Sequence, residues 1–84
     1  MSVHRIVVVR GRVQGVGYRA WMEITALERG IEGWVRNRRD GSVEALLIGG
    51  KDDVAAMIED CRGGPPGARV ETLDQREARP DDVV

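Results

Sequence analysis

An apolar run followed by a glycine-rich stretch is the feature that most constrains how this chain folds. Residues 6–9 are four consecutive β-branched aliphatic residues, a pattern that favours a buried strand. Residues 11–19 (GRVQGVGYR) come next, and residues 20–29 then carry apolar side chains at helical spacing. The sequence therefore predicts a strand, a tight turn and a helix. The first backbone N–H groups of such a helix have no partner inside it and can bind an anion.

The start of this predicted helix lacks the residues that ordinarily cap a helix. Ser, Thr, Asp or Asn is the usual N-cap, whereas Val16, Gly17 and Tyr18 precede the helix here. A bound phosphate would accept hydrogen bonds from the free N–H groups, and Arg19 would add a forked cation beside it. The alternative is that water caps the helix and the glycines only form a turn.

Periodicity and turn signals predict the remaining elements. The Asp40-Gly41 pair between two strand-like runs favours a hairpin. Each predicted helix has an apolar stripe, made of Ala20, Ile24, Leu27 and Ile31 in the first and of Val54, Met57, Ile58 and Cys61 in the second. The predicted strands are 3–10, 31–36, 42–48 and 68–78, and the predicted helices are 20–29 and 51–62.

The resulting β-α-β-β-α-β order is typical of a ferredoxin-like α/β (α+β) sandwich. In that fold both helices cover one face of an antiparallel or mixed sheet. A chain of 84 residues, 42% hydrophobic, fits a single domain over residues 1–84 with one core. The first strand is expected in the interior of the sheet and the last at an edge. The polar tail, residues 79–84, is expected to be loosely held.

Net charge, cysteine content and the length of apolar runs exclude some partners and compartments. The net charge of −1 offers no general attraction to nucleic acid or to anionic membranes. The single cysteine excludes an intramolecular disulfide and suits a reducing compartment, and its place on an apolar helix face indicates a buried small residue. No apolar run approaches the ~20 residues that cross a bilayer, and no signal-peptide pattern is present. We therefore expect a cytoplasmic monomer that binds neither nucleic acid nor membrane.

The predicted topology places two polar side chains at the same rim of the sheet. The first strand ends at the glycine-rich loop, and the second runs in the same direction and ends at Asn37. Arg19 opens the first helix, so Arg19 and Asn37 should lie near one another. The set has no general base, nucleophile pair or metal-ligand cluster, which leaves chemistry that depends on charge and positioning. Phosphoryl transfer from a good leaving group to a water held by Asn37 fits this set. The alternative is that Asn37 only flanks the hairpin.

Three segments resemble the acylphosphatase family. They are residues 11–19, residues 33–37 (GWVRN) followed by 40–44 (DGSVE), and, more weakly, residues 64–70 (GPPGARV). The resemblance implies the ferredoxin-like fold and an enzyme that hydrolyses small acyl phosphates to inorganic phosphate without metal or cofactor. It also implies that Arg19 binds the substrate phosphate and that Asn37 orients the attacking water. The phosphate cradle would be completed by the loop amides of Gln14, Gly15, Val16, Gly17 and Tyr18.

This chain departs from the family pattern at two places. Tyr18 stands where many members have Phe, and its hydroxyl needs a partner if it is buried. Members commonly end in a further strand with an aromatic residue, whereas this chain contains no Phe. Here that strand is expected to be short or absent.

Three other readings of the sequence remain to be weighed. Residues 15–20 match a dinucleotide-binding fingerprint, but the hairpin after the second strand is incompatible with a Rossmann fold. An RNA-recognition domain has the same element order, but it stacks bases on aromatic residues of the first and third strands. The predicted strands 3–10 and 42–48 contain no aromatic residue. The only feature that favours RNA binding is the basic cluster of Arg36, Arg38 and Arg39. This cluster could equally attract an anionic substrate. The third alternative is a non-catalytic module that binds acyl or carbamoyl phosphate, as occurs at the start of large hydrogenase-maturation carbamoyltransferases.

Overall fold

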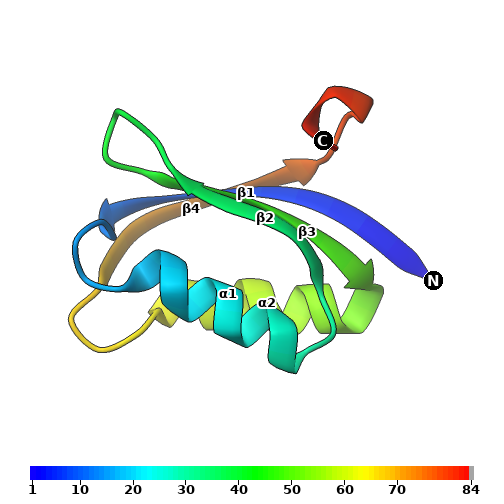
Figure 1. Ribbon diagram of the computed structural model, residues 1–84, viewed down its shortest axis with the longest axis horizontal. Coiled ribbons are helices and arrows are strands. Elements are labelled where there is room, and N and C mark those ends of the chain that lie inside the picture. Colours follow the sequence, from blue (N-terminus) through cyan, green and yellow to red (C-terminus); the bar gives the residue numbers. More distant parts are fainter. Residues whose placement is uncertain (84) are drawn as a thin grey trace.

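The predicted order of elements is confirmed in the computed structural model, which describes residues 1–83. Val84, the last residue of the predicted tail, lies outside the described residues. The elements are β1 (Ser2–Arg12), α1 (Tyr18–Glu28), β2 (Glu32–Asn37), β3 (Val43–Gly50), α2 (Lys51–Gly63) and β4 (Arg69–Glu77), followed by a 3₁₀ turn over Pro80–Asp82 (Figure 1).

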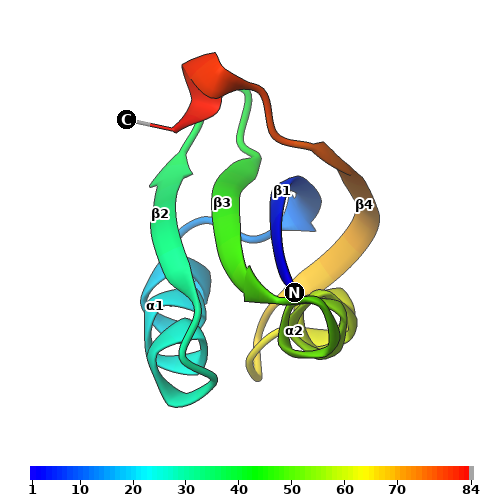
Figure 2. The same ribbon diagram turned by 90° about the vertical axis from the view of Figure 1, so that its right-hand side faces the viewer.

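The four strands form one sheet in the order β2-β3-β1-β4, and each neighbouring pair is antiparallel. Because β1 and β2 both run antiparallel to β3, they share one direction and end at the same side of the molecule. Both helices cover a single face of the sheet (Figures 1 and 2). The interior position of β1 and the edge position of β4 are as predicted.

The main core lies between the sheet and the two helices. From the sheet it receives Val7 and Val9 of β1 and alternate residues of β3. The predicted apolar face of α2 is confirmed, since Val54, Met57, Ile58 and Cys61 are all buried. Burial also raises the pKa of the Cys61 thiol to about 11, which fits a buried small residue and not a nucleophile.

The predicted apolar face of α1 is wrong. Ile24 is 60% exposed and Leu27 is 80% exposed, whereas Tyr18 and Met22 are buried. The helix begins two residues earlier than the pattern indicated, so that Tyr18 is its first residue. With Tyr18 included, the residues spaced by four, Tyr18, Met22 and the half-buried Ala26, face the core, because such positions share one side of a helix.

The face of the sheet away from the helices carries the C-terminal tail (Figure 1). Trp34 of β2 donates from Nε1 to the carbonyl of Asp82 at 2.9 Å, and the guanidinium of Arg76 donates to the Asp82 carboxylate at 2.8 Å. The bond from Arg76, with a second from the backbone N–H of Arg79, holds the pKa of the Asp82 carboxyl down, at about 2. Within residues 1–83 no strand follows β4. How loosely the tail is held stays a prediction.

Candidate active site

The loop between β1 and α1 is shaped by glycines in the left-handed conformation. Gly15 and Gly17 have φ angles of 76° and 80°. A Cβ at either position would meet no atom within 4 Å, so the backbone angle and not lack of space favours glycine there. The loop is consequently open to solvent on its outer side.

The N-terminus of α1 is uncapped, as the sequence predicts. Its N-cap residue is Gly17, no side chain accepts a hydrogen bond from the first turn, and that turn contains no acidic residue. Several backbone N–H groups therefore lack a protein acceptor. The positive end of the helix dipole lies at the same place, so a negative group would be stabilised there.

Tyr18 anchors this helix start to the second helix. Its side chain is only 1% exposed, and its hydroxyl donates to the carbonyl of Cys61 at 2.5 Å, which supplies the partner that a buried Tyr requires. Burial is the main cause of a raised pKa at Tyr18. Since the ring points into the core, Tyr18 presents only its backbone to the outer side of the loop.

The side chain of Gln14 joins the glycine-rich loop to the β2–β3 hairpin. Its Nε2 donates to the carbonyls of Arg38 and Ser42, both at 2.8 Å. The hairpin turn is itself ordered, because the carboxylate of Asp40 accepts hydrogen bonds from the backbone N–H and the hydroxyl of Ser42. These bonds lower the pKa of Asp40. Sequence reasoning considered Gln14 only for its backbone amide and missed this contact.

Arg19 and Asn37 lie at the end of the molecule where the loop and the hairpin meet. Arg19 is the second residue of α1, and Asn37 is the last residue of β2, paired in register with Val43. Asn37 immediately precedes Arg38, whose carbonyl Gln14 holds. Both side chains are exposed, and neither forms a hydrogen bond or ion pair with residues 1–83. The two groups that the sequence placed at one rim are thus free to contact a ligand.

The three arginines of the cluster, Arg36, Arg38 and Arg39, differ in whether they form ion pairs. Arg36 donates from Nε and Nη2 to Glu44 Oε1 at 2.8 and 2.6 Å, and its guanidinium lies 5.1 Å from the centre of the Trp34 ring. Arg38 and Arg39 form no ion pair within residues 1–83. Of the cluster, Arg38 and Arg39 are therefore the arginines whose guanidinium groups no carboxylate of residues 1–83 holds in a close ion pair.

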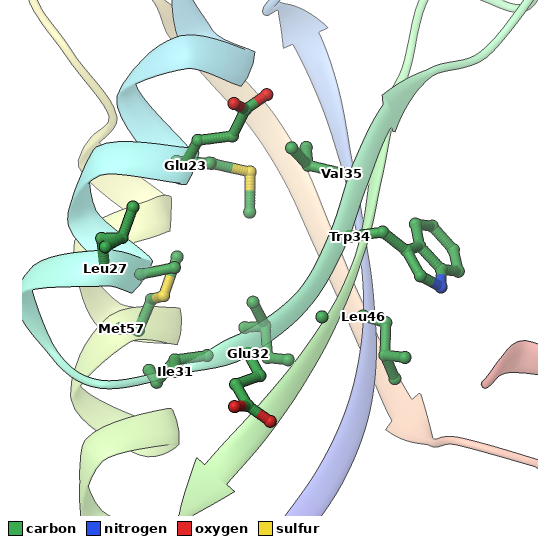
Figure 3. A pocket seen from close by; sticks show the side chains of 12 residues that line it. Glu23, Leu27, Ile31, Glu32, Trp34, Val35, Leu46 and Met57 are labelled. Atoms are coloured by element: carbon green, nitrogen blue, oxygen red, sulfur yellow. The ribbon is translucent and has the colours of Figure 1, made fainter. Parts of the chain in front are cut away.

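An apolar groove of about 550 Å³ lies elsewhere, between α1 and β2 (Figure 3). Met22, Leu27, Ile31, Val35 and Met57 contribute to its lining. None of the site residues predicted from the sequence lines this groove. The candidate site is instead an open rim made largely of backbone donors, which suits a small, strongly charged ligand.

Among residues 1–83, no three His, Cys, Asp or Glu side chains are grouped as ligands of a metal ion would be. None of the helices in this range has the length and apolar character needed to span a membrane.

Comparison with known proteins identifies the family. A family model described as Acylphosphatase matches residues 5–83. The chain belongs to the acylphosphatase family. A protein named Acylphosphatase from Rhodopseudomonas palustris strain BisB5 is 62% identical over 77 residues, which is 92% of this chain and 78% of that protein. The prediction of an acylphosphatase, a hydrolase, is thereby confirmed.

Solved structures agree with the fold. The crystal structure of acylphosphatase from Bacillus subtilis matches with a TM-score of 0.88 and 37% identity, over 94% of this chain and 87% of that one. The crystal structure of HypF from T. kodakarensis matches with a TM-score of 0.78 and 36% identity, over 95% of this chain but 10% of that protein. The ferredoxin-like α+β fold predicted from the sequence is confirmed.

Proposed function

We propose that this acylphosphatase hydrolyses the carboxyl–phosphate bond of small acyl phosphates, releasing a carboxylate and inorganic phosphate. Arg19 and the backbone N–H groups of residues 14–18 hold the phosphoryl group, and Asn37 positions the water that attacks it. The main support is the uncapped start of α1, which lies beside the unpaired Arg19 and is tied by Gln14 to the strand end that carries Asn37.

Binding of the phosphoryl group follows from charge and hydrogen bonding. Its oxygens would accept bonds from the N–H groups that α1 leaves free, and they would sit at the positive end of the helix dipole. Arg19 can donate two parallel hydrogen bonds to the same group without first breaking an ion pair. The backbone donors are held in place by the helix before the reaction, so together with Arg19 they would stabilise the charge that spreads over the equatorial oxygens in the transition state.

The chemical step needs little beyond positioning. The Asn37 carboxamide oxygen would accept a hydrogen bond from one water and direct it in line with the leaving group. The water oxygen forms a bond to phosphorus, and the bond from phosphorus to the acyl oxygen breaks. One proton of the water stays on the attacking oxygen, and the other passes to solvent or to another oxygen of the phosphate. The leaving group is a carboxylate, which is stable without protonation, so no general acid is required. Neither metal nor cofactor takes part in this mechanism.

The test is hydrolysis of benzoyl phosphate in EDTA by wild type and by Asn37→Ala. We expect Asn37→Ala to lower kcat about 100-fold, as misplacement of a reacting group does, while the Kd for inorganic phosphate stays near the wild-type value. Gln75→Ala, which removes an exposed carboxamide from β4, is the matched control and should retain turnover. Wild-type turnover in the Asn37 variant would contradict the role given to Asn37.

A second candidate is a module that binds acyl or carbamoyl phosphate without hydrolysing it. The similarity to one tenth of HypF from T. kodakarensis favours it, because the fold there is part of a much larger protein. Under this candidate the folded wild-type protein would bind inorganic phosphate but would not turn over benzoyl phosphate in the same assay.

We also propose that the enzyme acts as a cytoplasmic monomer whose partners are the acyl phosphate and inorganic phosphate, with no nucleic acid or membrane. The single cysteine is buried, which fits a compartment where disulfides are not formed. Light scattering coupled to size-exclusion chromatography tests the oligomeric state, and a dimer mass would contradict it.

A further inference from the structure

The arginines of this protein differ in whether a carboxylate pairs with them. Five of them form ion pairs with carboxylates, namely Arg10, Arg29, Arg36, Arg62 and Arg76. Arg12 and Arg69 are exposed and take part in no ion pair or side-chain hydrogen bond within residues 1–83. Their charges are therefore available to a ligand.

Arg12 and Arg69 are also direct neighbours across two strands. They are Cα partners in the register of β1 and β4. Like charges placed directly opposite one another on a sheet are destabilising. No local carboxylate offsets this repulsion: Asp74 is engaged by Arg10, and the exposed Glu71 joins none of the ion pairs in residues 1–83. An anion between the two guanidinium groups would relieve it.

An irregularity in the sheet creates this juxtaposition. The register between β1 and β4 shifts between Arg10 and Gly11, so that Glu71 is passed over and Arg12 falls opposite Arg69. The strands approach so closely there that a Cβ on Gly11 would lie 2.1 Å from the carbonyl oxygen of Arg69. Bulges of this kind re-aim side chains and often lie beside active sites.

The pair lies at the same end of the molecule as the proposed phosphate cradle. Arg12 is the last residue of β1, and the glycine-rich loop begins directly after it, while Arg69 opens β4 at that end (Figure 1). Gly15 follows Arg12 by three positions, so their Cα atoms are within roughly 11 Å of each other.

We infer that Arg12 and Arg69 form a subsite for a second anionic group on the substrate. The inference rests on the proposed function of the loop. The preferred substrates of the enzyme are then acyl phosphates whose acyl part carries a carboxylate or a phosphate of its own. A neutral acyl group would use the phosphoryl cradle alone.

Binding tests this subsite without requiring turnover. The probes are ethylphosphonate, which has one anionic group, and 3-phosphonopropionate, which adds a carboxylate at the end of a short chain. We expect wild type to bind 3-phosphonopropionate more tightly than ethylphosphonate by about fivefold, the range of one or two exposed ion pairs. The double variant Arg12→Gln/Arg69→Gln should lose this preference. Arg5→Gln, which removes an equal charge near the other end of β1, should keep it.

The outcomes separate the subsite from the mechanism. Unfolding midpoints should not fall in the double variant, because a like-charge repulsion has been removed. If the double variant lost affinity equally for both probes, the two arginines would exert only a general attraction, and the subsite would be overturned. An unchanged preference for 3-phosphonopropionate in the double variant would overturn it as well. Kinetically, the double variant should lose about fivefold more kcat/KM on 3-carboxybenzoyl phosphate than on benzoyl phosphate. If wild type hydrolyses neither compound, the proposed function fails, while the phosphonate preference still decides the subsite.

Discussion

The two helices of this protein begin in similar ways but differ in charge. Each starts after a glycine, Gly17 for α1 and Gly50 for α2, and neither has a side-chain N-cap. The first turn of α2 contains Asp52 and Asp53, whose carboxylates complement the positive end of the helix dipole. Each first turn also contains a cation, Arg19 in α1 and Lys51 in α2, but α1 has no acidic residue there to offset it. The α2 terminus supplies its own negative charge, whereas the α1 terminus is left to take one from a ligand.

The difference suggests why one helix start serves function and the other stability. A cation at a helix N-terminus opposes the dipole and lowers stability slightly. Arg19 is therefore unfavourable for the empty fold and favourable once a phosphate is bound. Substitutions that change the charge at the start of each helix test this explanation directly.

Replacement of Arg19 by Ala should have the largest effect. We expect kcat/KM for benzoyl phosphate to fall by about 10²–10³, the loss typical of one donor to a developing charge, and phosphate affinity to fall as well. The matched control is Lys51→Ala, which removes the cation from the first turn of α2. Equal losses in both variants would indicate a general charge effect and not a site at α1.

Replacement of Gln14 by Ala should have the next largest effect. The variant loses both bonds from the loop to the hairpin, so Arg19 and Asn37 are no longer held at a fixed separation. We expect kcat to fall about tenfold through lost positioning, with a smaller change in the Kd for phosphate. Stopped-flow turnover and phosphate titration separate the two quantities. A loss confined to phosphate affinity would contradict the positioning role.

Replacement of Ala20 by Asp should make α1 resemble α2. Ala20 is the third residue of α1 and is exposed, and Asp53 is the third residue of α2. The new carboxylate should stabilise the phosphate-free protein by about 0.3–1 kcal/mol and weaken phosphate binding about fivefold by occupying the same positive field. Ala20→Asn is the neutral control. Tighter phosphate binding by the Asp variant would be incompatible with an anion site at this terminus.

Replacement of Tyr18 by Phe should have the smallest effect, and its sign should depend on pH. At pH 7 the variant loses the bond to the Cys61 carbonyl, which should cost about 0.5–1.5 kcal/mol. The pKa of Tyr18 is raised above its ordinary value of 10.0, so the unfolded state loses this proton first as the pH rises. Wild type should therefore lose stability relative to Tyr18→Phe above pH 10. Urea unfolding at pH 7 and pH 11 measures this, and a constant difference between the proteins would refute it.

Local patterns were sufficient to predict much of this fold. The Asp-Gly hairpin and the apolar face of α2 depend on residues close in sequence, and both were predicted correctly. The face of α1 was mispredicted because Tyr18 looked like a loop residue, although its ring is buried and its hydroxyl is bonded to α2. The choice between two apolar stripes on α1 thus depended on a contact 43 positions away in sequence.

The candidate site was predicted only in part for the same reason. Topology placed Arg19 and Asn37 at one end, since strand direction follows from the order of elements. The Gln14 side-chain contacts span 24 and 28 positions, and no local spacing indicates them. The division of the arginines likewise depends on strand register, which pairs Arg36 with Glu44 and Arg12 with Arg69.

The central claim is that α1 takes its N-terminal charge from a phosphoryl group while α2 supplies its own. Titration of the ¹⁵N-labelled wild-type protein with inorganic phosphate, followed at every backbone amide, tests it most directly. We predict saturable shifts at residues 14–19 with one Kd, and none at residues 51–53. Equal shifts at both helix starts, or no shift at residues 14–19 in a protein that hydrolyses benzoyl phosphate, would contradict the account.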